Sequence, residues 1–116
     1  DDSVSECLFC RISAGDIPAE IVLETPELVA FRDIDPQAPT HVLVIPRDHF
    51  DNIGDLTRDQ PELAASLLRA ASEVAQLETL EHGYRVVTNI GGDGGQSVHH
   101  VHLHVLGGRA MTWPPG

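Results

Sequence analysis

The sequence contains no lysine, and its seven basic residues are all arginines set against 18 Asp and Glu residues, so the formal net charge is −11. A chain this acidic is poorly suited to a nonspecific grip on nucleic acid or on an anionic lipid surface, because both need a basic patch. We therefore expect neither partner. Any phosphate group that the protein binds must be held by other means.

Long apolar segments are also missing. No run approaches the roughly 20 residues that cross a bilayer, and no charged start followed by an apolar core indicates a signal peptide. With 116 residues, 41% of them hydrophobic, the chain is long enough for one compact domain and too short for two full-sized ones. We expect a single domain over residues 1–116, a cytoplasmic location, and loose structure in the polar residues 1–6.

Local patterns predict both strands and a long helix. The segments 21–24 and 28–33 are rich in β-forming residues and lie three residues apart, which predicts a hairpin. The continuous apolar run 42–45 is typical of a central strand buried on both faces. Thr57 and Gln60 have the spacing of a capping box, which predicts a helix of about 20 residues behind them. Its apolar face would consist of Leu63, Leu67, Ala71, Val74 and Leu77.

The order of the elements predicts the fold class. A short helix at 7–12 should end before Gly15, and two more strands are expected at 84–89 and 100–106. Strands joined by short turns on either side of one long helix favour an antiparallel sheet over a doubly wound parallel one. We therefore expect an α+β fold with a five-stranded antiparallel sheet, one long helix and one short helix.

Four of the seven histidines fall within six residues, at His99, His100, His102 and His104. Alternate side chains of a strand share a face, so the last three should project together while the apolar residues between them face the core. Three imidazoles on one face suit two chemistries. They could hold a metal ion, or one of them could attack an electrophile such as phosphorus while its neighbours set its tautomer.

A glycine-rich loop lies immediately before the histidines. Residues 89–97 read Asn-Ile-Gly-Gly-Asp-Gly-Gly-Gln-Ser. Glycine lets the backbone approach a ligand closely and turn its N–H groups inward, so such a loop can bind a phosphate without Lys or Arg. The alternative is a plain connection between two strands, against which Gln96 and Ser97 weigh as polar donors.

The ordered motifs of the chain resemble one family. His100-Val-His102-Leu-His104-Val-Leu is similar to the pattern that names the histidine triad (HIT) family, and the segments 94–98 and 113–116 resemble its Hint branch of nucleoside phosphoramidases. Residues 31–34 and 39–46 extend the resemblance over nearly the whole chain. It implies a single HIT domain whose tail, residues 107–116, lies near the active site.

The resemblance implies a covalent mechanism. His102 would attack the α-phosphorus of a purine nucleoside phosphoramidate, release the amine, and form a nucleotidyl-histidine that water hydrolyses to the monophosphate. His104 would bind the phosphate oxygens or the leaving group, and Ser97 and Gln96 would add neutral donors. His41 would support proton transfer. The remaining triad member, His100, belongs to the same catalytic set, and no catalytic cofactor is required.

The resemblance also implies a site for an AMP-type ligand. Phe31 and Ile34 would sandwich the purine, and Asp33 would accept hydrogen bonds from the ribose hydroxyls. A homodimer is implied as well, in which Trp113 of one chain reaches the neighbouring active site. The full set of substrate-binding residues would be Leu8, Phe9, Ile12, Phe31, Asp33, Ile34, Asn89, Gly95, Gln96, Ser97, Val98 and Trp113.

The only cysteine pair, Cys7-x-x-Cys10, has the spacing of half a zinc site or of a redox pair. In a reducing compartment zinc or free thiols are the main choices. Some relatives that the chain resembles complete such a pair with two histidines, which here are His49 and His100. That structural zinc site would tie the N-terminal helix to the sheet. His99 is a less favoured replacement for His100.

Other functions stay open at the level of sequence. A sister branch of the family hydrolyses dinucleoside polyphosphates, although the Trp-Pro-Pro-Gly ending favours phosphoramidates. The pocket could also serve a nucleotide-binding regulatory or interaction protein. A metal hydrolase would place zinc on His100, His102 and His104. Neither the leaving group nor a preference for adenine or guanine follows from the sequence.

Overall fold

The computed structural model describes residues 6–116, so the expectation of loose structure in the first residues falls almost entirely outside the described part. The predicted fold class is confirmed: within the described residues five strands form one sheet, accompanied by three helices. In chain order the elements are α2 (Leu8–Ser13), β1 (Ile21–Glu24), β2 (Leu28–Arg32), β3 (Thr40–Pro46), α3 (Ile53–Asp59), α4 (Pro61–Leu77), β4 (Tyr84–Val87) and β5 (Leu103–Gly107).

The sheet has the strand order β1-β2-β3-β5-β4, and every neighbouring pair is antiparallel. The predicted hairpin joins β1 to β2, and its turn is held by the Thr25 hydroxyl, which accepts the N–H groups of Glu27 and Leu28 at 3.2 Å. The predicted central strand is β3, whose seven residues are all buried. This burial follows from the apolar run, because a strand covered on both faces has no solvent side.

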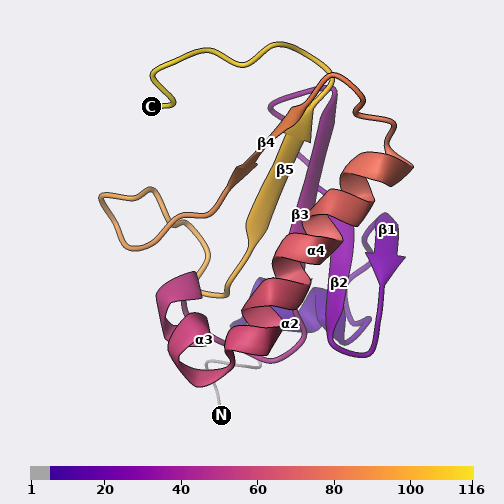
Figure 1. The fold of residues 1–116 in the computed structure, drawn as a ribbon. Helices are drawn as coiled ribbons and strands as arrows, with labels where there is room; N and C mark the ends of the chain where they lie inside the picture. Colours follow the sequence, from indigo (N-terminus) through magenta and orange to yellow (C-terminus); the bar gives the residue numbers. More distant parts are fainter. Residues whose placement is uncertain (1–5) are drawn as a thin grey trace.

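Helix α4 crosses one face of the sheet (Figure 1). Its buried stripe includes four of the five residues predicted from the periodicity, whereas Leu77, in the last position of the helix, is 58% exposed. On the sheet side Val101, Leu103 and Val105 belong to the same core cluster. The apolar residues between the histidines therefore face α4, as the alternation predicts.

The predicted start of the long helix is wrong. Thr57 does not cap it, because this residue lies inside the additional helix α3, where its hydroxyl donates to the Gly54 carbonyl at 2.9 Å. The cap of α3 is Asn52, whose side chain accepts the Asp55 N–H. Helix α4 begins at Pro61, which lacks an N–H and suits a first helical position. The long helix consequently has 17 residues.

Helix α2 packs against the other face of the sheet, behind it in Figure 1. Phe9 of this helix joins a second core cluster with Val29, Phe31, Leu43 and Ile45. The helix ends as expected, with Gly15 just beyond it at φ 83°. The last strand is shorter than predicted, because β5 begins only at Leu103, and His100 and His102 lie in the irregular segment before it, which bends at residues 98–100. No helix within residues 6–116 is long and apolar enough to cross a membrane.

Candidate active site

A cavity of about 570 Å³ opens on the face of the sheet that carries α2. Two of the three triad histidines, His102 and His104, lie in its wall. The other predicted residues that the structure brings to this cavity are Leu8, Phe9, Ile12, Phe31, Asp33, Ile34, Ser97 and Val98. Helix α2, strand β2 and the end of the glycine loop thus supply one site.

Several predicted substrate-binding residues do not line this cavity: Asn89, Gly95, Gln96 and Trp113. The Trp113 side chain is 82% exposed. The Asn89 amide donates to the Gly94 carbonyl at 2.6 Å and so closes the glycine loop on itself. Within the loop, the Gly95 N–H donates to the Gly92 carbonyl at 3.0 Å. The sequence suggested that N–H groups of this loop bind a phosphate, whereas some of them form hydrogen bonds within the loop itself.

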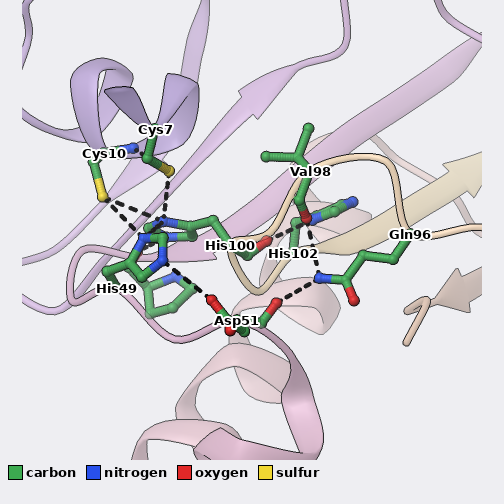
Figure 2. Close-up of polar contacts among 9 residues, drawn as sticks. Cys7, Cys10, His49, Asp51, Gln96, Val98, His100 and His102 are labelled. Carbon is green, nitrogen blue, oxygen red and sulfur yellow. Dashed lines mark hydrogen bonds and ion pairs between the residues drawn. The ribbon is translucent and has the colours of Figure 1, made fainter. Parts of the chain in front are cut away.

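Gln96 fastens the glycine loop to the rest of the protein. Its carbonyl oxygen accepts the Gly91 N–H at 3.0 Å, and its amide nitrogen donates to the main-chain oxygens of Val98 and Asp51 (Figure 2). Both ends of the side chain are thus engaged. In this structure Gln96 positions Ser97 and Val98, which do line the cavity.

The ring of His102 has a defined tautomer. Its Nδ1 lies 2.8 Å from the main-chain oxygen of His100, an acceptor only, so Nδ1 carries the proton and donates it there (Figure 2). The lone pair is therefore on Nε2. The side chain is 5% exposed and lies edge-on to Phe9, with ring centroids 5.1 Å apart. A buried, oriented imidazole with a free lone pair can act as a nucleophile.

His41 and His104 form a hydrogen-bonded pair beside His102. The Gln37 N–H donates to His41 Nδ1 at 3.0 Å, so His41 carries its proton on Nε2 and donates it to His104 Nδ1 at 2.9 Å. His104 then keeps its own proton on Nε2. Burial lowers the pKa of His104 to about 4, an effect increased by the neighbouring imidazoles of His102 and His41. Burial also lowers the pKa of His41, which the nearby Asp33 carboxylate opposes.

The third triad histidine takes part in a different cluster. His100 is fully buried, and its Nδ1 lies 3.3 Å from Cys7 Sγ, 3.4 Å from Cys10 Sγ and 3.2 Å from His49 Nδ1 (Figure 2). Cys10 Sγ is also 3.3 Å from His49 Nδ1. These are the four ligands predicted for zinc, and their ligand atoms lie within 4.8 Å of one another. His99 is exposed and stands outside the cluster.

The chemistry of this cluster fits zinc. Both imidazoles present Nδ1 inward while Nε2 faces an acceptor, the Pro46 carbonyl at 2.8 Å for His100 and the Asp51 carboxylate at 3.4 Å for His49. Such outer acceptors orient histidine ligands at metal sites. Burial lowers the pKa of His100 to about 4, which keeps it in the neutral ligand form. Burial also raises the pKa of the Cys10 thiol to about 12, so its thiolate needs a cation beside it.

A zinc ion shared by His100, His102 and His104 finds no support in this geometry. The Nδ1 atom of His100 faces the cysteines, while Nδ1 of His102 is bonded to a carbonyl. Within residues 6–116 the second group with metal-ligand spacing is Asp33, His41 and His104. There the Gln37 N–H keeps the proton of His41 on Nε2, where a metal would have to bind.

Sequence reasoning missed part of the cavity wall. Leu43 lies on β3 two residues beyond His41, so strand alternation could have placed both side chains on the same face. The segment 17–20 between α2 and β1 carries no motif. This segment and Arg32 also line the cavity, and their position there depends on how the chain turns before the hairpin.

Comparisons with known proteins give a consistent result. The HIT domain family model matches residues 14–111. The chain is 48% identical to a 14 kDa zinc-binding protein of Zea mays, over 100% of this chain and 91% of that protein. A HIT family hydrolase from Legionella pneumophila is 55% identical, with a TM-score of 0.92 over 96% of this chain and 100% of its own.

A more distant solved structure is the histidine triad nucleotide-binding protein from Candida albicans. It is 30% identical, with a TM-score of 0.81 over 94% of this chain and 83% of that chain. The family model, the relatives and the paired His102 and His104 beside one cavity agree. This chain belongs to the HIT family.

Proposed function

We propose that this protein is a nucleotide-binding hydrolase that cleaves the P–N bond of purine nucleoside phosphoramidates through a covalent intermediate on His102. The observation that carries the proposal is the orientation of that ring. Its Nδ1 proton is held by the His100 carbonyl at 2.8 Å, which leaves the Nε2 lone pair on a residue of the cavity wall. The relatives described as a hydrolase and as a nucleotide-binding protein support the same class.

The cavity suits a nucleoside. Leu8, Ile12 and Ile34 supply apolar surface for the faces of a purine, and Phe31 lies at the base of the same wall with 4% exposure. The Asp33 carboxylate lies beside these residues and can accept hydrogen bonds from two ribose hydroxyls. Apolar contact stacks adenine and guanine alike, so this wall selects a purine by shape and area.

In the first step His102 Nε2 attacks the α-phosphorus, a new N–P bond forms, and the P–N bond to the amine breaks. The amine must take up one proton as it leaves. His104 Nε2 can supply this proton, because the rings of His102 and His104 are neighbours, with centroids 5.0 Å apart. A bound phosphate anion raises the pKa of His104 from its low value in the free protein and so makes the protonated form accessible.

In the second step a water molecule attacks the same phosphorus, gives one proton back to His104 Nε2, and the His102 N–P bond breaks. AMP leaves, and the His102 imidazole regains its lone pair on Nε2. The Ser97 hydroxyl, on the cavity wall, can donate to a phosphate oxygen as charge develops. Splitting one displacement into two lets the same histidine serve both as nucleophile and as leaving group.

Zinc has a structural place in this proposal. Cys7, Cys10, His49 and His100 would hold the ion, which would join α2 to the segment that precedes β5. Bound zinc supplies folding free energy and no step of the reaction.

The proposal includes one HIT domain that works as a homodimer. Strand β4 is at the edge of the sheet and exposes Tyr84 and Val86, with 40% and 38% of their surface accessible. An exposed apolar edge strand is a surface on which a second copy can pair. The tail, residues 107–116, would then contribute near the active site, where Met111 and Thr112 already approach His104 through a shared cleft.

The test is to mix the protein with an adenosine 5′-phosphoramidate of a simple alkylamine. We expect release of AMP, and after a rapid quench that spares acid-labile bonds, a protein mass increased by one AMP group. His102→Ala should abolish both while AMP affinity stays within tenfold. His82→Ala, which changes an exposed histidine in the turn after α4, is the matched control. Turnover by His102→Ala at the rate of the unaltered protein would reject the proposal.

The same experiment separates the other functions. Cleavage of diadenosine polyphosphates in preference to the phosphoramidate would place the protein with the dinucleoside polyphosphate hydrolases. Tight binding of AMP without cleavage of either substrate would indicate a regulatory or interaction protein.

A further inference from the structure

A second cleft, of about 380 Å³, lies on the other side of the histidine pair. His104 lines both this cleft and the cavity proposed for the nucleoside, whereas His41 lines only the second. The remaining walls come from strands β4 and β5, from the tail and from the segment before β3. They include Arg85, Arg109, Asn89 and Gln37.

The second cleft carries positive charge in a strongly acidic protein. Arg85 and Arg109 both line it, and no Asp or Glu does. Arg85 donates to the Thr112 carbonyl at 2.8 Å, and Arg109 donates to the Gln37 carbonyl at 2.9 Å. The ion pairs of arginine within residues 6–116 involve other arginines, on β2, after β3 and on α3. Two guanidinium groups therefore line one cleft. Their hydrogen-bond partners are main-chain carbonyls, and no carboxylate forms an ion pair with either of them within residues 6–116.

The position of the cleft relates it to the reaction. In a displacement at phosphorus the attacking and leaving atoms lie roughly in line, on opposite sides of the phosphorus. When the nucleoside occupies the first cavity and its phosphorus lies beside His102 and His104, the leaving group points past His104. The second cleft begins at that residue. Asp33, which is 3.4 Å from His41, lines the nucleoside side only.

We infer that this cleft is a subsite for the leaving group and that it selects leaving groups with an anionic oxygen group. The inference rests on the proposed function, because it assigns the second half of the same substrate. Arginine binds carboxylates and phosphates through paired N–H donors. Asn89 and Gln37 place side-chain amides at the same wall, each with one N–H already donated to a carbonyl, of Gly94 and of Asp35, and one N–H left. The anionic group could be the carboxylate of an amino acid joined through its nitrogen, or the phosphate of a dinucleoside polyphosphate.

The first arm of the experiment compares two matched substrates. One is AMP joined through nitrogen to glycine, which has a free carboxylate, and the other is the same compound as its methyl ester. We expect kcat/KM to favour the carboxylate by about tenfold or more, because its hydrogen bonds to arginine are charge-assisted and those of the ester are not. Diadenosine triphosphate, tested beside them, distinguishes a phosphate leaving group from a carboxylate.

The second arm removes the charges. Arg85→Gln and Arg109→Gln should each reduce the ratio of kcat/KM for the carboxylate to kcat/KM for the ester by several-fold, and the double variant should bring this ratio to about one. Arg85→Lys should retain part of the preference. Arg69→Gln is the control, because it removes one charge from the exposed face of α4. An unchanged preference in the double variant would overturn the inference.

A binding measurement separates this inference from the proposed function. Calorimetry on His102→Ala gives the affinities of the two intact glycine compounds without turnover. His102→Ala should bind the compound with the free carboxylate more tightly than the methyl ester, and adding Arg85→Gln and Arg109→Gln should remove this difference. That result supports the subsite even if cleavage of P–N bonds is not observed. Equal affinities within twofold would overturn the inference even if the unaltered protein cleaves both compounds.

Discussion

His100 and His102 are two residues apart and come from one motif, yet their rings have opposite orientations. His100 donates Nε2–H to the Pro46 carbonyl and presents Nδ1 to the cysteines. His102 donates Nδ1–H to the His100 carbonyl and keeps Nε2 for the cavity. In each case a main-chain oxygen at 2.8 Å selects the tautomer.

Phe9 separates the two environments. Its ring lies edge-on to both imidazoles, with centroids 6.0 Å from His100 and 5.1 Å from His102. On one side the imidazole is fully buried and faces sulfur, as a metal ligand does. On the other it borders a cavity large enough for a nucleoside. Identical side chains thus present different ring nitrogens, one to the Cys/His cluster and the other to the cavity, because different main-chain oxygens accept their N–H groups.

Breaking the Cys/His cluster should have the largest effect on stability. We expect Cys10→Ser to reduce zinc below one equivalent and to lower the free energy of unfolding by at least about 3 kcal/mol, because bound zinc contributes folding free energy. At a temperature where the variant is folded, turnover should fall by less than tenfold. Elemental analysis and denaturant unfolding measure the first two quantities.

Arg11→Ser is the control for that substitution, since it alters an exposed neighbour in the same helix. A Cys10→Ser protein that keeps one zinc ion and its full stability would contradict a structural role for the cluster. Complete loss of turnover in a folded variant would instead contradict the separation of the two histidine environments.

Removing the partner of His102 should have the next largest effect. We expect His104→Gln to lower the rate of amine release by about a hundredfold, the scale of general acid catalysis, while zinc content and AMP affinity remain near those of the unaltered protein. Single-turnover kinetics measure this rate. The exposed control His82→Gln should leave this rate unchanged. A rate that His104→Gln leaves unchanged, or that both variants lower equally, would contradict the assignment.

The same residue should make stability depend on pH. The pKa of His104 is about 4 in the folded protein against an ordinary value of 6.5, so the unfolded chain binds the proton more tightly. The stability that the neutral form of His104 contributes to the folded protein is fully present above pH 6.5 and is lost as the pH falls toward 4. Relative to His104→Gln, the unaltered protein should lose about 2 kcal/mol between pH 7 and pH 5. Urea unfolding at both pH values measures it, and parallel losses in both proteins would contradict the prediction.

Sequence patterns predicted those features that depend on side-chain alternation. The apolar run 42–45 placed the central strand, and the alternation around His102 placed the imidazoles opposite the α4 face. Helix α3 was missed because its cap is Asn52, while Thr57, which resembles a cap, bonds within the helix. Competing local bonds of this kind are decided only by the folded backbone.

The orientation of the rings could not be predicted either. It depends on the carbonyl of Pro46 for His100 and on the carbonyl of His100 for His102. A sequence does not show which main-chain carbonyl will accept a given ring N–H. The cleft beside His104 has the same origin, since Arg85 and Arg109 are 24 positions apart and meet only because β4 pairs with β5.

Gln96 offers the finest test of how the two histidine environments are connected. Asp51 contacts His49 through its carboxylate and accepts the Gln96 amide through its main-chain oxygen (Figure 2). The cluster is therefore linked through one residue to the loop that carries Ser97.

Gln96→Ala should cost about 1 kcal/mol of stability, the scale of a lost side-chain hydrogen bond, and should speed amide exchange in residues 91–97. If Gln96 instead binds the phosphate directly, as the sequence alone suggested, AMP affinity should fall with no change in amide exchange of the free protein. Asn89→Ala, which also removes a bond within the loop but none to Asp51, is the matched control. Zinc affinity should weaken in Gln96→Ala and not in Asn89→Ala, because only the former loosens the residue that orients His49.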